Sequence, residues 1–345
     1  MELSDRKKKI LATVVRSYIL TGEPVGSKAL CEILGGVSSA TIRNDMSELA
    51  ELGYLTQPHT SAGRIPTART YRMYVDSLMK KHTLTDDERQ KISSLLPDRA
   101  EDSDRILRMA AKSLSGATGC TAIATSQTDA GTLLHRVELI PMGPSMALIV
   151  LVTSTGEVRS RMFRLDCLLT NQLSERFTGL IEKELIGREI SGIHPAELQT
   201  LAASSEYALE LTPLIWALGE LIEETGESRL EIAGETRMLS YADISAGKAR
   251  EIFELLSRRE EVLALLDTWG GESGVIIGGD TSLDALDRSS MVLARYRMGD
   301  AHTGYIGVIG PMRMDYDMLL PGIEYFASLL SARSAPHERN DTDGR

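Results

Sequence analysis

A chain of 345 residues, of which 42% are hydrophobic and 25% charged, is long enough for two or three folded domains and excludes a wholly disordered protein. Its three cysteines, Cys31, Cys120 and Cys167, form no Cys-x-x-Cys motif, which argues against a disulfide framework or a structural zinc site and fits a reducing cytoplasm. Because no apolar segment follows the basic start and no run of about eighteen apolar residues occurs, we expect neither secretion nor a membrane span.

The net charge of −11 is unevenly distributed along the chain. Residues 1–82 carry twelve Lys and Arg against eight Asp and Glu, a net charge of +4, so the remaining residues carry −15. This asymmetry is typical of a basic nucleic-acid-binding module on an acidic body, although charge also varies along chains without functional meaning.

Residues 1–82 show the pattern of three helices followed by a hairpin. In chain order we predict helices over 4–21 and 28–34, the second capped by Ser27, a third helix beginning at Ser38, a hairpin of 54–57 and 64–65 around the turn 59–63, and a fourth helix capped by Thr67. In the third helix Ile42, Met46 and Leu49 share one face, and Val37 precedes the cap at the spacing of a hydrophobic staple. This order is that of a winged helix-turn-helix, in which the second helix of the motif lies in the major groove of DNA.

A polar, acidic stretch, 83–103, is predicted to link this module to the rest of the chain. In the remainder of the chain we predict first a helix over 104–116 and then strands at 120–126, 134–140, 145–153 and 157–165. Helices follow over 173–186, 206–224 and 247–266, with a short strand at 229–233. The last predicted elements are strands at 274–278, 290–297 and 304–309 and a helix from Tyr316 to Leu330. Strands interrupted by helices indicate an α/β domain with an inserted helical subdomain. The polar tail, 333–345, is expected to be disordered.

The polar face of the third helix is the candidate DNA-reading surface. If Ile42, Met46 and Leu49 face the core, a step of about 100° per residue places Asn44 and Ser47 on the opposite side. Arg suits guanine and Asn suits adenine, whereas hydroxyls and glycine-containing loops suit phosphate or the minor groove. From this face, the second helix and the wing we predict DNA contacts by Lys28, Ser38, Ser39, Ala40, Thr41, Arg43, Asn44, Ser47, His59, Thr60, Ser61, Gly63 and Arg64.

Simpler interpretations of these features also stand. The helix face can be a plain solvated surface and the wing a plain surface hairpin. The basic residues 6–9 either help to neutralise backbone phosphate or only keep the surface soluble.

Catalytic signatures are absent from the sequence, so we expect no enzyme, no metal and no cofactor. There is no Gly-x-Ser-x-Gly elbow, Walker loop or His-Glu-x-x-His motif. Gly278-Gly279 and the segment 307–311 are glycine-rich but lack the spacing of a phosphate loop, and we interpret them as turns between strands. Arg313 and Asp315 are interpreted as structural rather than ligand-binding.

Several segments carry a family resemblance. They are 22–27 (Gly-Glu-Pro-Val-Gly-Ser), 39–46 (Ser-Ala-Thr-Ile-Arg-Asn-Asp-Met), 57–67, Tyr71-Arg72, 74–76, 307–311 and 313–316. Together they resemble the HrcA-type heat-inducible transcription repressors of bacteria, from about residue 3 to residue 330, and the wing segment is the most specific piece. The match is poorest over about 185–270, and Gly278-Gly279-Asp280 differs from the family's usual Gly-x-Glu.

The resemblance implies an α+β multidomain protein. Its parts are a winged-helix domain over 1–82, a GAF-like domain over 104–186 and 271–332, and an inserted, mostly helical dimerising domain over 187–270. It further implies a homodimer that binds an inverted-repeat operator and represses chaperone operons, with a chaperonin that maintains the active repressor until heat draws it away. The helices 206–224 and 247–266 are candidates for the dimer surface or, equally, for the core.

Two other functions remain open from the sequence. One is a metabolite-sensing winged-helix repressor, in which the GAF-like domain holds a small effector. The other is a nucleic-acid-processing enzyme that uses the winged helix as an accessory. Ligand-dependent operator affinity would favour the first, and a metal cluster or a nucleophile–base pair in a cleft would favour the second.

Overall fold

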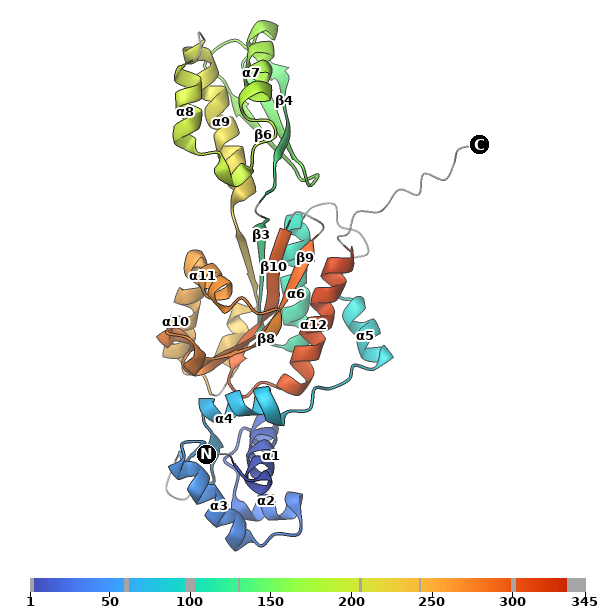
Figure 1. The fold of residues 1–345 in the computed structure, drawn as a ribbon, viewed down its shortest axis with the longest axis vertical. Coiled ribbons are helices and arrows are strands. Elements are labelled where there is room, and N and C mark those ends of the chain that lie inside the picture. The colour runs from blue at the N-terminus through green and yellow to red at the C-terminus, as the bar shows by residue number, and fades with distance from the viewer. Residues whose placement is uncertain are drawn as a thin grey trace, which may run out of the picture. The chain divides into compact units, whose positions relative to one another are not determined.

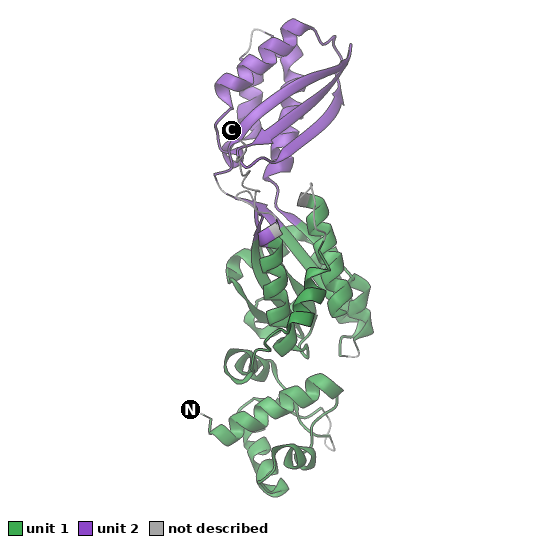
Figure 2. Ribbon diagram, turned by 90° about the vertical axis from the view of Figure 1, so that its right-hand side faces the viewer, with its two compact units in different colours: residues 1–125, 230–296, 305–330 green, residues 126–229, 297–304, 331–345 purple. Residues whose placement is uncertain are grey.

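The computed structural model describes residues 3–58, 62–96, 103–129, 131–204, 207–241, 243–298 and 302–333. The chain forms two compact units (Figure 2). Unit 1 comprises Met1–Thr125, Leu230–Tyr296 and Tyr305–Leu330, and unit 2 comprises Ser126–Arg229, Arg297–Gly304 and Ser331–Arg345. The segments Ser126–Arg229 and Arg297–Gly304 of unit 2 are therefore inserted into the sequence of unit 1. Of the predicted tail, 333–345, all but Arg333 lies outside the described residues.

Unit 1 begins with the predicted three helices and hairpin. The elements are α1 (Asp5–Thr21), α2 (Ser27–Leu34), α3 (Ser39–Glu51), β1 (Leu55–Thr56), β2 (Ile65–Pro66) and α4 (Ala68–Met73), which continues as a π-helical turn (Tyr74–Leu78). Their core buries Ile10, Leu11 and Leu30 against Ile42 and Leu49. This is the winged-helix part of unit 1, and we call the rest of unit 1 the body.

The helix caps agree only partly with the predictions. Ser38 caps α3 as predicted, because its hydroxyl accepts a hydrogen bond from the backbone of Thr41 at 3.1 Å. The prediction that Ser27 caps α2 is wrong: Gly26 is at the N-cap, and the Ser27 hydroxyl lies 3.3 Å from that of Ser39. Thr67 is at the N-cap of α4, but its hydroxyl donates to the backbone carbonyls of Gly53 and Tyr54, between α3 and β1, instead of accepting from the helix.

The body is built on a five-stranded sheet with helices on both faces (Figure 1). The strand order is β7 (Arg229–Ala233), β3 (Thr121–Thr128), β10 (His302–Pro311), β9 (Ser289–Met298) and β8 (Ser273–Ile277). The helices are α6 (Ser103–Thr118), α10 (Ala246–Ser257), α11 (Arg259–Trp269) and α12 (Tyr316–Arg333). Ile252 of α10 and Leu266 of α11 share a core with Leu293 and Ile309, whereas α6 and α12 cover the opposite face (Figure 1).

Glycines in the body have two different roles. Gly278 lies in a short 3₁₀ turn (Gly278–Asp280) after β8, as the turn interpretation predicted. The same interpretation is wrong for 307–311, which is the second half of β10. A Cβ on Gly307 would lie 2.1 Å from the carbonyl oxygen of Val292, so glycine is needed there because two strands approach closely.

Arg313 and Asp315 both have structural partners, as predicted. Arg313 forms an ion pair with Asp243, and the carboxylate of Asp315 accepts a hydrogen bond from the backbone of Met318 at 3.4 Å, at the start of α12.

Within the described residues, unit 2 combines a three-stranded antiparallel sheet with three α-helices. They are β4 (Leu134–Gly143), β5 (Met146–Thr153), β6 (Val158–Arg164), α7 (Asn171–Glu184), α8 (Pro195–Ala203) and α9 (Ala208–Gly226). Ile149 and Leu151 on one face of β5 share a core with Phe177 of α7 and Leu214 and Leu218 of α9.

The compact unit differs from the predicted inserted segment, 187–270. It begins at Ser126, because β4–β6 bury their apolar face against α7 and α9. The first and longest segment of the unit ends at Arg229, because α10 and α11 bury their apolar faces in the body instead. The predicted helix over 247–266 is two helices that meet at Arg258, whose φ of −90° and ψ of 76° are not helical.

The predicted linker, 83–103, contains the helix α5 (Asp86–Ser93). Its start is a capping box, in which Thr85 accepts from the backbone of Glu88 and the Glu88 carboxylate accepts from the backbone of Thr85 at 2.8 Å. The Glu88 carboxylate also lies 2.9 Å from the ring of His82.

This carboxylate predicts an acid-sensitive helix start. The hydrogen bonds from His82 and from the backbone and hydroxyl of Thr85 lower the pKa of Glu88 from 4.5 to about 2. Because the folded-state pKa is the lower one, the stabilisation is present above pH 4.5 and is lost as the pH falls towards 2. Amide exchange of α5 should therefore accelerate over that range, and Glu88→Gln should remove the transition. Asp86→Asn, in the same turn, is the matched control, and a transition that persisted in Glu88→Gln would contradict the assignment.

Candidate nucleic-acid interface

Helix α3 is fixed by apolar packing and by two ion pairs to α1, one with a buried carboxylate and one with an exposed carboxylate. Ile42 and Leu49 are fully buried. Arg6 of α1 donates two hydrogen bonds to the buried carboxylate of Asp45, at 2.6 and 3.0 Å, and Lys7 pairs with Glu48. Two of the basic residues 6–9 therefore hold the helix, a role that neither of their sequence-based interpretations included. The buried carboxylate of Asp45 is therefore neutralised by a residue of α1, and Arg43 on the outer side of α3 is not needed for that role.

The outer side of α3 carries the predicted reading residues. Ala40, Arg43 and Asn44 are exposed. The hydroxyls of Ser39, Thr41 and Ser47 are half-buried and are bonded within the domain, to Ser27, to Ser38 and to the carbonyl of Arg43 respectively. Arg43 and Asn44 are therefore exposed side chains in the N-terminal half of α3 that can donate hydrogen bonds to base edges.

The wing is a short hairpin tied to the segment before α2. Leu55 pairs with Pro66 and Thr56 with Ile65. Arg64 exchanges two backbone hydrogen bonds with Val25, each of 2.9 Å. The predicted contacts His59, Thr60 and Ser61 at the tip lie outside the described residues.

Gln57 positions the guanidinium of Arg64. Its amide oxygen accepts a hydrogen bond from Arg64 Nη1 at 2.5 Å, and its amide nitrogen donates to the carbonyl of Ala62 at 2.9 Å. Gln57 was not among the predicted contacts, although its place at the end of the first hairpin strand, across the turn from Arg64, is a signal that could have identified it.

A groove of about 500 Å³ brings the two predicted surfaces together. Arg43 and Ser47 of α3 line one side, and Gln57, Gly63 and Arg64 line the other. The N-terminus of α2 contributes Gly26 and Ser27, whereas Lys28 is exposed on α2 and does not line the groove. The groove is therefore lined by two guanidinium groups, one from α3 and one from the wing.

Two further findings concern the described residues alone. Among them, no group of three or more His, Cys, Asp and Glu side chains could hold a metal ion. No helix within the same ranges combines the length and the apolar character that crossing a membrane requires.

A three-helix core, a capped helix with its polar side outward and a hairpin beside it define a winged helix-turn-helix regulator of transcription. Residues 2–79 match the family model "Winged helix-turn-helix transcription repressor, HrcA DNA-binding", and residues 104–319 match "HrcA protein C terminal domain". The chain belongs to the HrcA family of heat-inducible transcription repressors, which is not a class of enzymes.

Curated relatives match over almost the whole chain. The heat-inducible transcription repressor HrcA of Thermobifida fusca is 37% identical over 320 residues, which cover 91% of this chain and 92% of that one. Its counterpart in Symbiobacterium thermophilum is 34% identical and covers 95% and 98%. A crystal structure of a hypothetical protein, 26% identical, covers 96% of this chain and 98% of its own with a TM-score of 0.68.

Proposed function

We propose that this repressor binds an inverted-repeat operator as a homodimer, with α3 in the major groove and the wing on the backbone. The observation that carries the proposal is the groove that Arg43 of α3 and Arg64 of the wing both line. The contacts are assigned to Lys28, Ser38, Ser39, Ala40, Thr41, Arg43, Asn44, Ser47, His59, Thr60, Ser61, Gly63 and Arg64.

The geometry supports different roles in DNA binding for these residues. Arg43 and Asn44 are exposed on α3, where a guanidinium can read guanine and an amide can read adenine. Arg64 is held by Gln57 and by the Val25 backbone, which suits a fixed contact to phosphate. The hydroxyls of Ser39, Thr41 and Ser47 are bonded within the domain and act mainly by shaping the surface.

The remaining architecture is proposed to consist of a GAF-like body and an inserted dimerising domain. A five-stranded sheet with helices on both faces, interrupted in sequence by a second unit, supports this interpretation. In unit 2, Leu209 and Trp216 of α9 are exposed apolar side chains, which suits a surface that a second copy covers. The helices α10 and α11 instead use their apolar faces within the body.

Regulation by heat is proposed to act through a chaperonin in the cytoplasm. The relatives are named heat-inducible repressors, and a chaperonin that keeps the repressor active would be withdrawn by unfolded clients at high temperature. The direct test is operator affinity at constant temperature with and without chaperonin and ATP, and unchanged affinity would count against this route.

The binding surface is tested with a labelled inverted-repeat duplex and fluorescence anisotropy. Arg43→Ala should cost about 1–3 kcal/mol of specific binding and relax base preference, because the lost contact is to a base edge. Arg64→Ala should weaken binding to all duplexes and lower the salt slope by about 1. Arg250→Ala, which removes an exposed arginine of α10, is the matched control. Wild-type affinity in both Arg43→Ala and Arg64→Ala would overturn the assignment.

A further inference from the structure

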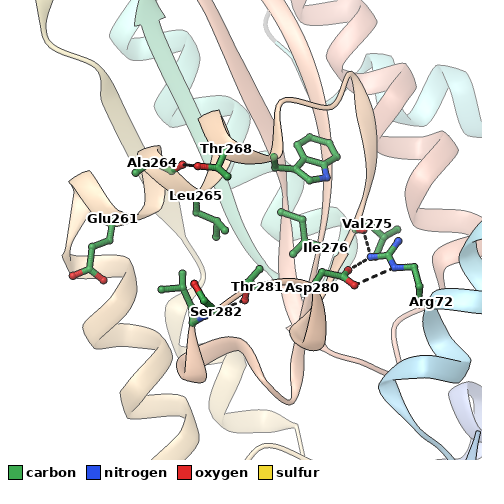
Figure 3. Close-up of a pocket in the computed structure, with 12 residues that line it drawn as sticks. Arg72, Glu261, Ala264, Leu265, Thr268, Val275, Ile276, Asp280, Thr281 and Ser282 are labelled. Carbon is green, nitrogen blue, oxygen red and sulfur yellow. Dashed lines mark hydrogen bonds and ion pairs between the residues drawn. The ribbon is translucent and has the colours of Figure 1, made fainter. Parts of the chain in front are cut away.

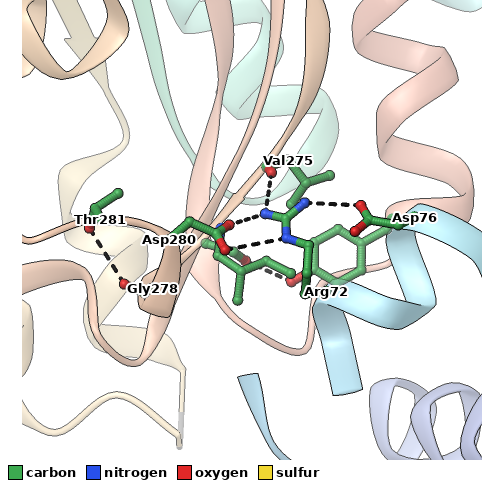
Figure 4. A network of polar contacts seen from close by, with 9 residues as sticks. Arg72, Asp76, Val275, Gly278, Asp280 and Thr281 are labelled. Atoms are coloured by element: carbon green, nitrogen blue, oxygen red, sulfur yellow. Dashed lines mark hydrogen bonds and ion pairs between the residues drawn. The ribbon is translucent and has the colours of Figure 1, made fainter. Parts of the chain in front are cut away.

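The winged-helix part is joined to the body by polar contacts at the end of β8. Arg72 of α4 and Asp280 both line a cavity of about 800 Å³ between α11 and β8 (Figure 3). Figure 4 shows that Arg72 donates to both carboxylate oxygens of Asp280 and, at 2.7 Å, to the carbonyl of Val275. Asp280 also accepts a hydrogen bond from the backbone of Ile277 at 2.8 Å, which fixes it against β8. Because the guanidinium borders a cavity, this contact depends on its hydrogen bonds more than on close packing.

A second set of contacts joins the winged-helix part to the start of α12. The hydroxyl of Tyr74 donates to the carboxylate of Asp317 at 2.7 Å and accepts from Arg16 of α1 at 3.2 Å. Arg16 also pairs with the same carboxylate at 3.6 Å. The N–H of His82 donates to the carbonyl of Asp317 at 3.1 Å, so the chain that leaves the winged-helix part is tied to α12 as well.

Aromatic packing adds a third contact. Tyr71 of α4 packs edge-on against Tyr316 with ring centroids 6.1 Å apart, and both residues are buried. Contacts to β8 and to α12 together oppose rotation as well as displacement of the winged-helix part. We call these contacts the junction, which consists of Arg16, Tyr71, Arg72 and Tyr74 on the winged-helix side and Val275, Asp280, Tyr316 and Asp317 on the body.

We propose that the junction makes the protein selective for the number of base pairs between the two operator half-sites, with Arg72 and Tyr74 as positioning residues. This inference rests on the dimeric, inverted-repeat binding proposed above. When each winged-helix part is held on its body, the two α3 helices of a dimer keep one separation and one relative rotation. A change of two base pairs in the spacer moves a half-site by ~7 Å and turns it by ~70° about the duplex, which a fixed pair of helices cannot follow.

Loss of the junction leaves residues 79–81 as the connection ahead of the tie at His82. The ion pair of Lys81 with Glu324 in this stretch is largely exposed and contributes little. Three residues of extended chain span about 10 Å, which is enough to follow a half-site that moves by ~7 Å. A protein with a broken junction should therefore accept several spacers, and it should bind the preferred spacer more weakly because a flexible tether lowers the effective concentration of the second contact.

The test measures affinity for labelled inverted-repeat duplexes whose spacers differ by single base pairs over one helical turn, about 10 base pairs. The wild-type protein should prefer one spacer and lose about 100-fold in affinity two base pairs away, because only one half-site is then bound at a time. The double variant Arg72→Met/Tyr74→Phe should lose only about fivefold over the same change. The chain has two tryptophans, so urea unfolding followed at Trp269 in a Trp216→Phe background shows whether each variant folds.

Arg69→Met is the matched control for the junction. It removes an arginine of the same helix whose guanidinium bonds to the carbonyl of Leu52 within the winged-helix part, at 2.9 Å, and it should keep the wild-type spacer preference. An unchanged spacer preference in the double variant would overturn the proposal. If the double variant fails to fold, the single variants Arg72→Met and Tyr74→Phe decide, and wild-type preference in both rejects the junction. Equal wild-type affinity for a single half-site and for the inverted repeat would instead refute the dimeric binding on which the inference rests.

Discussion

Alanine in place of Gly307 is expected to lower the free energy of unfolding of unit 1 by on the order of 3 kcal/mol. Gly307 lies in the middle of β10, next to β9 in the sheet. The added methyl group would lie 2.1 Å from the carbonyl oxygen of Val292 and 2.8 Å from the side chain of Leu293. Backbone cannot swing aside as a flexible side chain can, so the two strands must separate and the core on both faces of β9 must loosen.

Urea unfolding of the Trp216→Phe protein measures this effect, because Trp269 then reports on the body. Gly116→Ala is the matched control: it makes the same change in α6, where a Cβ would meet no atom within 4 Å. A helical position favours alanine over glycine, so the control should be neutral or stabilising. Equal stability of Gly307→Ala and Gly116→Ala would mean that the strands are not as close as described.

The second large effect is expected from Gly63→Ala in the wing. A Cβ there would lie 2.5 Å from the carbonyl carbon and oxygen of Val25, at the point where Arg64 pairs with Val25. The hairpin must move away, and it takes the guanidinium of Arg64 out of the groove. Binding to specific and nonspecific duplexes should weaken about tenfold, which corresponds to ~1.4 kcal/mol.

A double mutant separates this cause from general unfolding. If Gly63→Ala acts by displacing Arg64, then adding Arg64→Ala should cost little more, because the two changes remove one contact. Gly116→Ala again serves as the stability control, because it lies in α6 outside the winged-helix part and its Cβ would meet nothing within 4 Å. Additive losses in the double mutant would show that the wing contributes to binding in some other way.

Local patterns predicted the winged-helix part because its signals lie close together in sequence. The Ser38 cap and the apolar face of Ile42 and Leu49 are contained in one helix, and the hairpin follows from its turn residues. The Ser27 cap failed because the hydroxyl of Ser27 meets Ser39, a neighbour that only the tertiary fold supplies. The helix α8 was missed because it is short and has little apolar contrast between its faces.

In the body and at the candidate site, contacts between distant segments limited how much of the structure could be predicted from the sequence. The break at Arg258 divides a continuous helical pattern into two helices that pack in one core. The polar face of α3 could be derived from periodicity, but the bond from Arg64 to Gln57 could not. Neither could the pairing of Arg72 with Asp280, because those residues are 208 positions apart.

The strands that connect the body to the inserted segment Ser126–Arg229 favour exchange of that segment during evolution. The chain leaves along β3 and returns along β7, and these two strands are neighbours in the sheet. The pairing of these strands keeps the two ends of the intervening stretch side by side, and closing such a stretch costs only about 0.6 kcal/mol more for each doubling of its length. A shorter, longer or unrelated appendage could therefore be grafted at this place while the body kept its strand order.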